Sequence, residues 1–145
     1  MNESATDLLK GRGILVTRPA HQAEAICALI EAAGGRAWRL PLLEIRPALD
    51  AAAVQAGLAR LADYDIAIFV SANAVNFALD ALDPRPWPPS LATAAVGAAT
   101  ARALEQRGLR VTYCPRAEFT SEALLALPAL QDMRGRRVVI LRGNG

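Results

Sequence analysis

Short apolar segments alternate with helical segments along almost the whole chain, and this alternation constrains the fold more than any other feature. Residues 66–70 (IAIFV) carry no polar side chain, which is typical of a strand buried on both faces of a parallel sheet. Similar segments predict strands at residues 13–17, 92–96, 110–114 and 136–142. Because helical patterns separate them, we expect βαβ units and a mostly parallel, doubly wound α/β fold.

The helices are predicted from apolar spacing, alanine content and glycine stop signals. These patterns predict helices at residues 21–33, 49–61, 74–82 and 97–108. Ser121 is expected to cap a short helix over residues 122–127. Residues 83–90 contain four of the nine prolines and predict an exposed loop.

Two predicted strands have unusual surroundings. Residues 38–45 predict a strand interrupted by Pro41, and a proline there belongs at a sheet edge or in a strand that leaves its sheet. The last strand, residues 136–142, is followed only by turn residues, whereas such a strand normally leads into a helix. We therefore expect this sequence to be cut short.

Composition and charge exclude several classes of protein. Of the 145 residues, 53% are hydrophobic and 21% charged, which indicates a folded domain with an aliphatic core and excludes disorder, collagen and coiled coil. The net charge of +2 gives no sign of a nucleic-acid or membrane-surface protein. Cys27, Cys114 and the single His21 suggest neither a zinc site nor a disulfide framework. Because no apolar run reaches the roughly 18 residues of a membrane span, a cytoplasmic protein is expected.

Polar residues gather where predicted strands end. In open α/β sheets, ligands bind beyond the carboxyl ends of the strands, where helix N-termini present unpaired N–H groups. Residues 17–19, 71–74, 97–100 and 142–144 form four such corners, with groups able to hold anionic oxygens. For Ser71 and Thr100 the alternative is simple helix capping. For Arg18 and Arg142 it is an exposed salt bridge worth little.

Familiar catalytic motifs are missing from the sequence. The segment VGAATA at 96–101 is not a GxGxxG motif, and there is no P-loop and no GxSxG. A single histidine and no paired carboxylates at a strand end leave no nucleophile with its base. The first strand lacks both the acidic pair of a Mg²⁺-binding response regulator and a phosphate loop for FMN. An enzyme with this sequence would therefore act by positioning and electrostatics.

Six segments in order resemble the uroporphyrinogen-III synthase family. They are VTRP at 16–19 with Gln22, LPLLEI at 40–45, YD at 64–65 leading to FVSANAV at 69–75, AVGAATA at 95–101, FTSEALL at 119–125 and ILRGNG at 140–145. The resemblance implies two flavodoxin-like domains joined by a two-stranded ladder, the first built from both ends of the chain. On this basis residues 1–42 begin domain 1, 43–46 form a ladder strand and 47–145 make most of domain 2. Members of the family run on for about a hundred further residues, so this sequence is expected to be an N-terminal fragment or a truncated gene product.

The resemblance also implies a reaction. Hydroxymethylbilane loses water from its ring A hydroxymethyl group, ring D inverts through a spiro intermediate, and the macrocycle closes as uroporphyrinogen III, for haem, sirohaem, cobalamin or chlorophyll. The family is monomeric and uses no cofactor, metal, nucleic acid or membrane. The 145-residue chain alone is expected to be inactive, and its incomplete sheets are expected to favour self-association.

Site residues follow partly from the resemblance and partly from charge. Thr100 matches the family's threonine in the VGxxTA corner, so it is the candidate catalytic residue. Tyr64 and Tyr113 do not match the family's candidate proton donor. Arg18 and Arg142 are electrostatic choices for carboxylates, and the candidate substrate-binding residues together are Arg18, Ser71, Ala72, Asn73, Gly97, Ala98, Arg142 and Gly143. The alternative function is a non-catalytic α/β module that binds tetrapyrrole anions or another partner.

Overall fold

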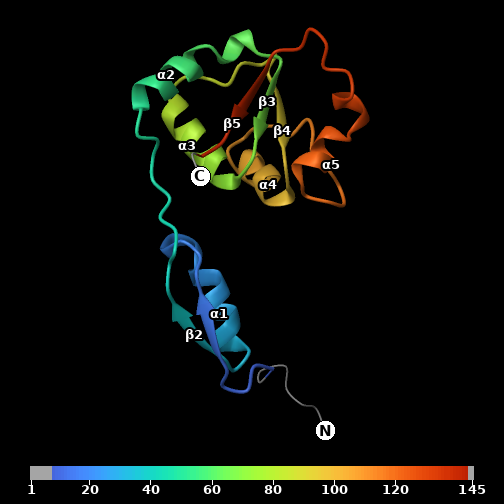
Figure 1. The fold of residues 1–145 in the computed structure, drawn as a ribbon. Coiled ribbons are helices and arrows are strands. Elements are labelled where there is room, and N and C mark those ends of the chain that lie inside the picture. Colours follow the sequence, from blue (N-terminus) through green and yellow to red (C-terminus); the bar gives the residue numbers. More distant parts are fainter. Residues whose placement is uncertain (1–7, 144–145) are drawn as a thin grey trace. The chain divides into compact units, whose positions relative to one another are not determined.

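The structure is a computed structural model that describes residues 8–143. The chain divides into two compact units, residues 1–46 (unit 1) and 47–145 (unit 2). Figure 1 shows the elements of each unit. Within the described residues, no helix is both long enough and apolar enough to cross a membrane.

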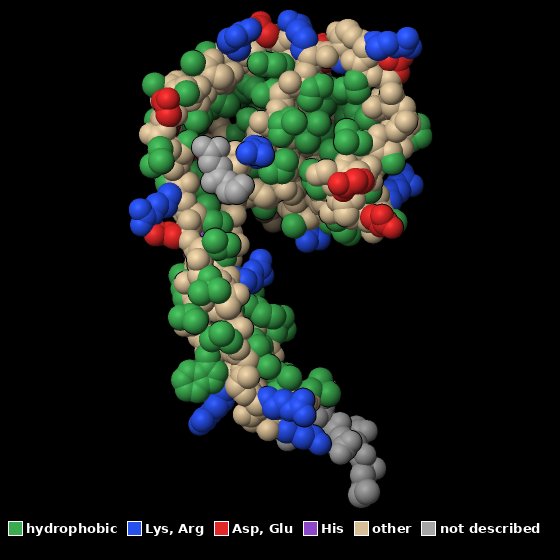
Figure 2. All heavy atoms as spheres, viewed as in Figure 1, with side chains coloured by type: hydrophobic (Ala, Val, Ile, Leu, Met, Phe, Trp, Pro, Cys, Tyr) green, Lys and Arg blue, Asp and Glu red, His purple; other side chains and the backbone are tan. Residues whose placement is uncertain are grey.

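Unit 1 is a single βαβ motif. Strand β1 (Gly13–Val16) leads through a 3₁₀ turn, η2 (Ala20–Gln22), into helix α1 (Glu24–Ala32), and strand β2 (Arg36–Arg39) pairs parallel to β1. The buried core between α1 and the strands consists of Val16, Ala23, Cys27 and Ile30. Residues on the other face of the pair stay exposed, including Leu15 and its partner Trp38. Figure 2 shows many hydrophobic side chains at the surface of the chain.

The predicted strand at 38–45 is wrong beyond Arg39, and β2 begins earlier than expected. Leu40 and Leu42 still donate backbone hydrogen bonds to β1 and Thr17, but residues 40–48 form no strand. The ladder ends here because its partner β1 itself ends at Val16, and Pro41 has no N–H to offer a strand on the outer side. No strand pairs with residues 43–46 within the described part of the chain, so the ladder stays a prediction.

Unit 2 is built on a three-stranded parallel sheet. Its strands are β3 (Ile66–Phe69), β4 (Ala92–Ala95) and β5 (Val138–Leu141), in the order β4-β3-β5. Helix α2 (Ala51–Ala59) and the turn η3 (Leu61–Asp63) precede β3. The later helices are α3 (Ala72–Leu82), α4 (Ala98–Gln106), α5 (Ser121–Leu125) and the turn η4 (Pro128–Leu130).

Helices cover both faces of this sheet, as a doubly wound fold requires. Phe69 of β3 is fully buried in a core shared with α3 and α4, and burial of such a side chain stabilises the fold by about 1.5–3 kcal/mol. Successive side chains of a strand point to opposite faces of the sheet, and Ile66 lies three residues before Phe69. Ile66 therefore packs on the other face, against Leu124 of α5 and Leu130. Apolar residues on both faces explain why β3 carries no polar side chain.

Two predictions within unit 2 are wrong. Residues 110–114 form only a single bridge, between Tyr113 and Ala94. The Thr93 hydroxyl donates to the Arg110 carbonyl, and the Thr112 N–H donates to the hydroxyl and the carbonyl of Thr93, so these groups are not free for a regular ladder. Thr120, not Ser121, caps α5, and its hydroxyl accepts from the Ala123 N–H at 3.1 Å. The other predicted elements of unit 2 occur within two residues at each end.

Candidate functional site

Three of the predicted corners meet at the carboxyl edge of the unit 2 sheet. In the ladder, Phe69 is the partner of both Ala95 and Leu141. Ser71, Gly97 and Gly143 each lie two residues beyond these partners. Parallel neighbours are about 4.8 Å apart, and the hydrogen bond from Val70 N to Leu141 O carries the pairing up to the edge. The register therefore places the three corners side by side.

The strand order places a switch point at this edge. From β3 the chain moves to β4 on one side, and it then crosses to β5 on the other side of β3. In doubly wound sheets the ligand crevice lies where the order reverses, outside the carboxyl ends of the strands. In unit 2 that position lies between the ends of β3 and β5, next to Ser71 and Arg142.

Ser71 caps α3 and still has a proton to donate. Its hydroxyl oxygen accepts from the Ala74 N–H at 3.1 Å, so the helix-capping interpretation is correct. A serine hydroxyl also has one O–H donor, which this hydrogen bond does not use. Ala72 and Asn73, the first two residues of α3, are half-buried beside it. The corner combines a hydroxyl with the positive end of an eleven-residue helix.

The α4 corner consists mainly of backbone. Gly97 is the N-cap residue and has no side chain to accept a hydrogen bond, so α4 begins without a side-chain cap. The N–H groups of the first turn, which starts at Ala98, have no partners within the helix. Thr100, in the same turn, is only 5% exposed. Its side chain is thus almost fully buried within the first turn of this helix.

The structure groups all but one of the predicted site residues. Arg142 and Gly143 are exposed beyond β5, whereas Asn144 of the predicted corner lies outside the described residues. Arg18 belongs to unit 1, where it is exposed just beyond β1 and lines an open apolar depression of about 410 Å³. The site residues that share the edge of unit 2 are Ser71, Ala72, Asn73, Gly97, Ala98, Thr100, Arg142 and Gly143.

One residue of this edge was not found from the sequence. A Cβ placed on Gly97 would lie 3.1 Å from the Cβ of Phe119, so the two residues are in close contact. Phe119 lies in one of the six family-like segments, and that was the only signal in the sequence. An apolar side chain in a loop carries no chemistry by itself, so the pattern singled out only Ser121 of this segment, as a helix cap.

Cys114, near the same edge, is not an activated nucleophile. Burial, and secondly the charge of Glu105, raise the pKa of its thiol above the ordinary value. Its Sγ atom donates to the Pro115 carbonyl at 3.5 Å. Since only the thiolate is a good nucleophile, the raised pKa favours a structural role.

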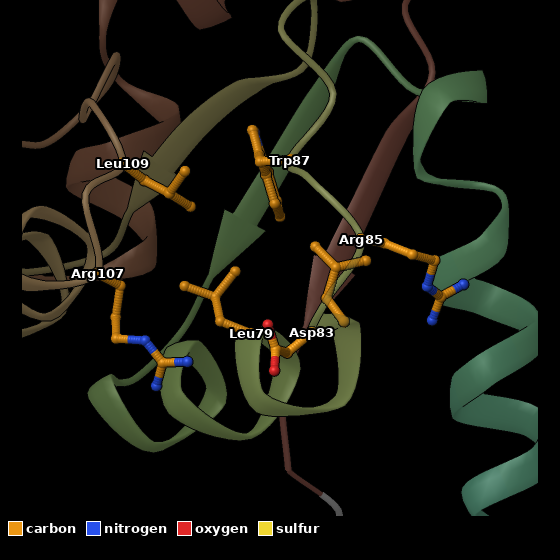
Figure 3. Close-up of a pocket in the computed structure, with 7 residues that line it drawn as sticks. Leu79, Asp83, Arg85, Trp87, Arg107 and Leu109 are labelled. Atoms are coloured by element: carbon orange, nitrogen blue, oxygen red, sulfur yellow. The ribbon is translucent and has the colours of Figure 1, made fainter.

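A small pocket lies at the other end of α3, away from this edge. Figure 3 shows Leu79, Asp83, Trp87 and Arg107 around it. The volume of the pocket is about 180 Å³. Arg107 is engaged in an ion pair with Asp80 at 2.7 Å. Pockets for small ligands usually measure about 300–1,000 Å³, so this one is too small to compete with the carboxyl edge as a candidate site.

These features define a doubly wound α/β protein with two helix N-termini at the carboxyl edge of its sheet. The strand order of unit 2, second-first-third along the chain, is that of the first three strands in flavodoxin-like sheets. The family model described as uroporphyrinogen-III synthase HemD matches residues 24–145, and the chain belongs to this family.

Similar proteins and structures agree with this assignment. The chain is 40% identical over 135 residues to uroporphyrinogen-III synthase from Salmonella typhimurium, covering 91% of this chain and 54% of that protein. The corresponding protein of Escherichia coli K12 is 38% identical, with the same coverage. The chain thus spans about half the length of the curated relatives it matches.

Solved structures support the fold. A crystal structure of a mutant uroporphyrinogen III synthase from Thermus thermophilus aligns with a TM-score of 0.63 at 22% identity, covering 90% of this chain and 61% of that one. The wild-type enzyme of the same bacterium aligns with a TM-score of 0.51 at 23% identity, covering 90% and 60%. At this identity the alignments show the fold alone.

Proposed function

We propose that this chain is part of a uroporphyrinogen-III synthase, which converts hydroxymethylbilane to uroporphyrinogen III. The observation that carries the proposal is the shared edge, where the strand register brings Ser71, Gly97 and Gly143 together in a chain of this family. Hydroxymethylbilane has eight carboxylates, and helix N-termini with a nearby guanidinium bind such anions well.

The chemistry requires folding of the substrate more than activation of a nucleophile. Water leaves the ring A hydroxymethyl group, and the cation that remains reacts readily with ring D. The protein must hold the substrate so that attack through the spiro intermediate is faster than direct closure. Positioning of this kind can lower the barrier by several kcal/mol. No cofactor is needed for these steps.

The proposal includes roles for the edge residues. The N–H groups at the start of α4 and the Ser71 hydroxyl donate to substrate carboxylates, and Arg142 pairs with another. Thr100 hydrogen-bonds the substrate from the first turn of α4. Arg18 contributes a further cation from unit 1, as part of the discontinuous first domain that includes residues 1–42.

The same proposal covers the partner and the location of the protein. Hydroxymethylbilane is the partner, and the enzyme works as a monomer in the cytoplasm. The two free thiols, Cys27 and Cys114, are compatible with a reducing compartment. The membership of the chain in the synthase family supports the identity of the substrate.

The test is an assay of the protein expressed from its complete reading frame. Hydroxymethylbilane is generated in the assay, and the isomers of the product are separated after oxidation. Formation of isomer III above the spontaneous isomer I background supports the proposal, whereas isomer I alone contradicts it. The 145-residue chain serves as a control and is expected to give isomer I only. Binding of tetrapyrrole by the complete protein without turnover would favour the non-catalytic module.

A further inference from the structure

Phe119 is a large apolar residue at the carboxyl edge, and 53% of it is exposed. One side of Phe119 lies against the N-cap of α4. An ideal Cβ on Gly97 would meet the Cβ, Cγ and Cδ1 atoms of Phe119 at 3.1, 3.6 and 3.9 Å. Phe119 therefore packs on glycine backbone on one side, while the rest of the residue is open.

The glycine at position 97 is explained by this contact and not by its backbone. Its φ and ψ are −153° and 170°, an extended conformation that any residue adopts. A side chain there would instead be forced into Phe119 at a distance that real Cβ atoms seldom show. Gly97 thus permits the close approach of an aromatic residue to the uncapped end of α4.

The loop that carries Phe119 is fixed on both sides. Pro115 is buried before it, and Thr120 caps α5 immediately after it with a hydrogen bond to the Ala123 N–H. A ring on the residue directly before an anchored helix cap loses less freedom when a ligand packs on it, which favours binding. Exposed apolar residues are common on protein surfaces, so the position of Phe119 is the informative observation.

We propose that the exposed side of Phe119 packs against one pyrrole ring of hydroxymethylbilane while carboxylates of that ring reach the N–H groups at the start of α4. This inference rests on the proposed function and adds a substrate-contact residue to it. Each ring of the substrate has an apolar π face and an anionic rim. The edge offers the matching pair, an aromatic side chain beside a positive helix end.

The test compares Phe119→Ala, Phe119→Leu and Phe119→Tyr in the protein expressed from its complete reading frame. Phe119→Ala is expected to raise the KM for hydroxymethylbilane about tenfold, which corresponds to about 1.4 kcal/mol, with a smaller effect on kcat. Phe119→Tyr keeps the ring, so its KM should stay within about twofold of the parent value. The KM of Phe119→Leu should lie between those of Phe119→Tyr and Phe119→Ala. Phe77→Ala is the matched control, because Phe77 is an exposed phenylalanine on α3.

The outcomes separate this inference from the proposed function. A parent protein that makes no isomer III overturns the proposed function and the inference with it. An active parent whose KM is unchanged in Phe119→Ala overturns the inference alone. The inference is also overturned if Phe119→Ala lowers kcat and the unfolding midpoint without raising the KM, because that pattern indicates packing on Gly97 only.

Discussion

Replacing Ser71 by aspartate separates the two roles of this residue, the helix cap and the substrate contact. Aspartate is as good an N-cap as serine, so the hydrogen bond to the Ala74 N–H should persist. Its negative charge at the positive end of α3 adds about 0.3–1 kcal/mol of stability. For a protein of 150–250 residues, 1 kcal/mol shifts the unfolding midpoint by about 2–4 °C. The midpoint of Ser71→Asp should therefore stay constant or rise.

Binding of the substrate should weaken in Ser71→Asp, although the stability of the protein does not fall. A substrate carboxylate about 5 Å from the new charge is repelled by about 1 kcal/mol at the dielectric of water and about 3 kcal/mol at an effective value of 20. The KM for hydroxymethylbilane should then rise by about five- to 150-fold, in addition to the loss of the hydroxyl donor. Because the charges are near the surface, the increase should shrink as ionic strength rises.

The assays are thermal unfolding and steady-state turnover of the protein expressed from its complete reading frame. Ser71→Ala is the first control: it removes the cap hydrogen bond and should cost about 1 kcal/mol of stability. Asp50→Ser is the second control. Asp50 caps α2 by accepting a 2.8 Å hydrogen bond from the Ala53 N–H, so this variant makes the reverse exchange of cap residues at another helix. A Ser71→Asp variant with an unchanged KM at low salt would refute the placement of a substrate carboxylate beside α3.

Three further predictions concern the same edge. Thr100→Ala should lower the rate of isomer III formation at least tenfold while the unfolding midpoint changes by only a few degrees, and unchanged turnover would remove Thr100 from the site. Gly97→Ala should cost about 1 kcal/mol by crowding Phe119, and adding Phe119→Gly should recover part of that loss; strictly additive effects on the midpoint would contradict the contact. Cys114 should be alkylated at pH 8 several-fold more slowly in the native chain than in urea, because burial raises the pKa of its thiol and less thiolate is present; equal rates, measured by mass spectrometry of the peptides, would show that the thiol is not protected.

Much of unit 2 could be predicted from local patterns. The strand at β3 and the helix after it were found because their apolar residues repeat with the periods of buried strands and helices, and because Ser71 is a strong helix-start signal. The two strand predictions that failed did so because of contacts with neighbouring segments. The strand at 110–114 is lost to hydrogen bonds with Thr93, and the strand at 38–45 stops because its partner β1 ends at Val16.

The sequence by itself determined the fold class, the family and the corners where polar residues follow the strands, since hydrophobic period and short motifs report how each segment is buried. Only the tertiary structure decided the order β4-β3-β5, and with it the neighbourhood of Ser71, Gly97 and Gly143. Strand order depends on pairing between segments far apart in the chain, which no local pattern records. The same holds for Phe119, whose contact with Gly97 exists because the loop before α5 returns to the start of α4.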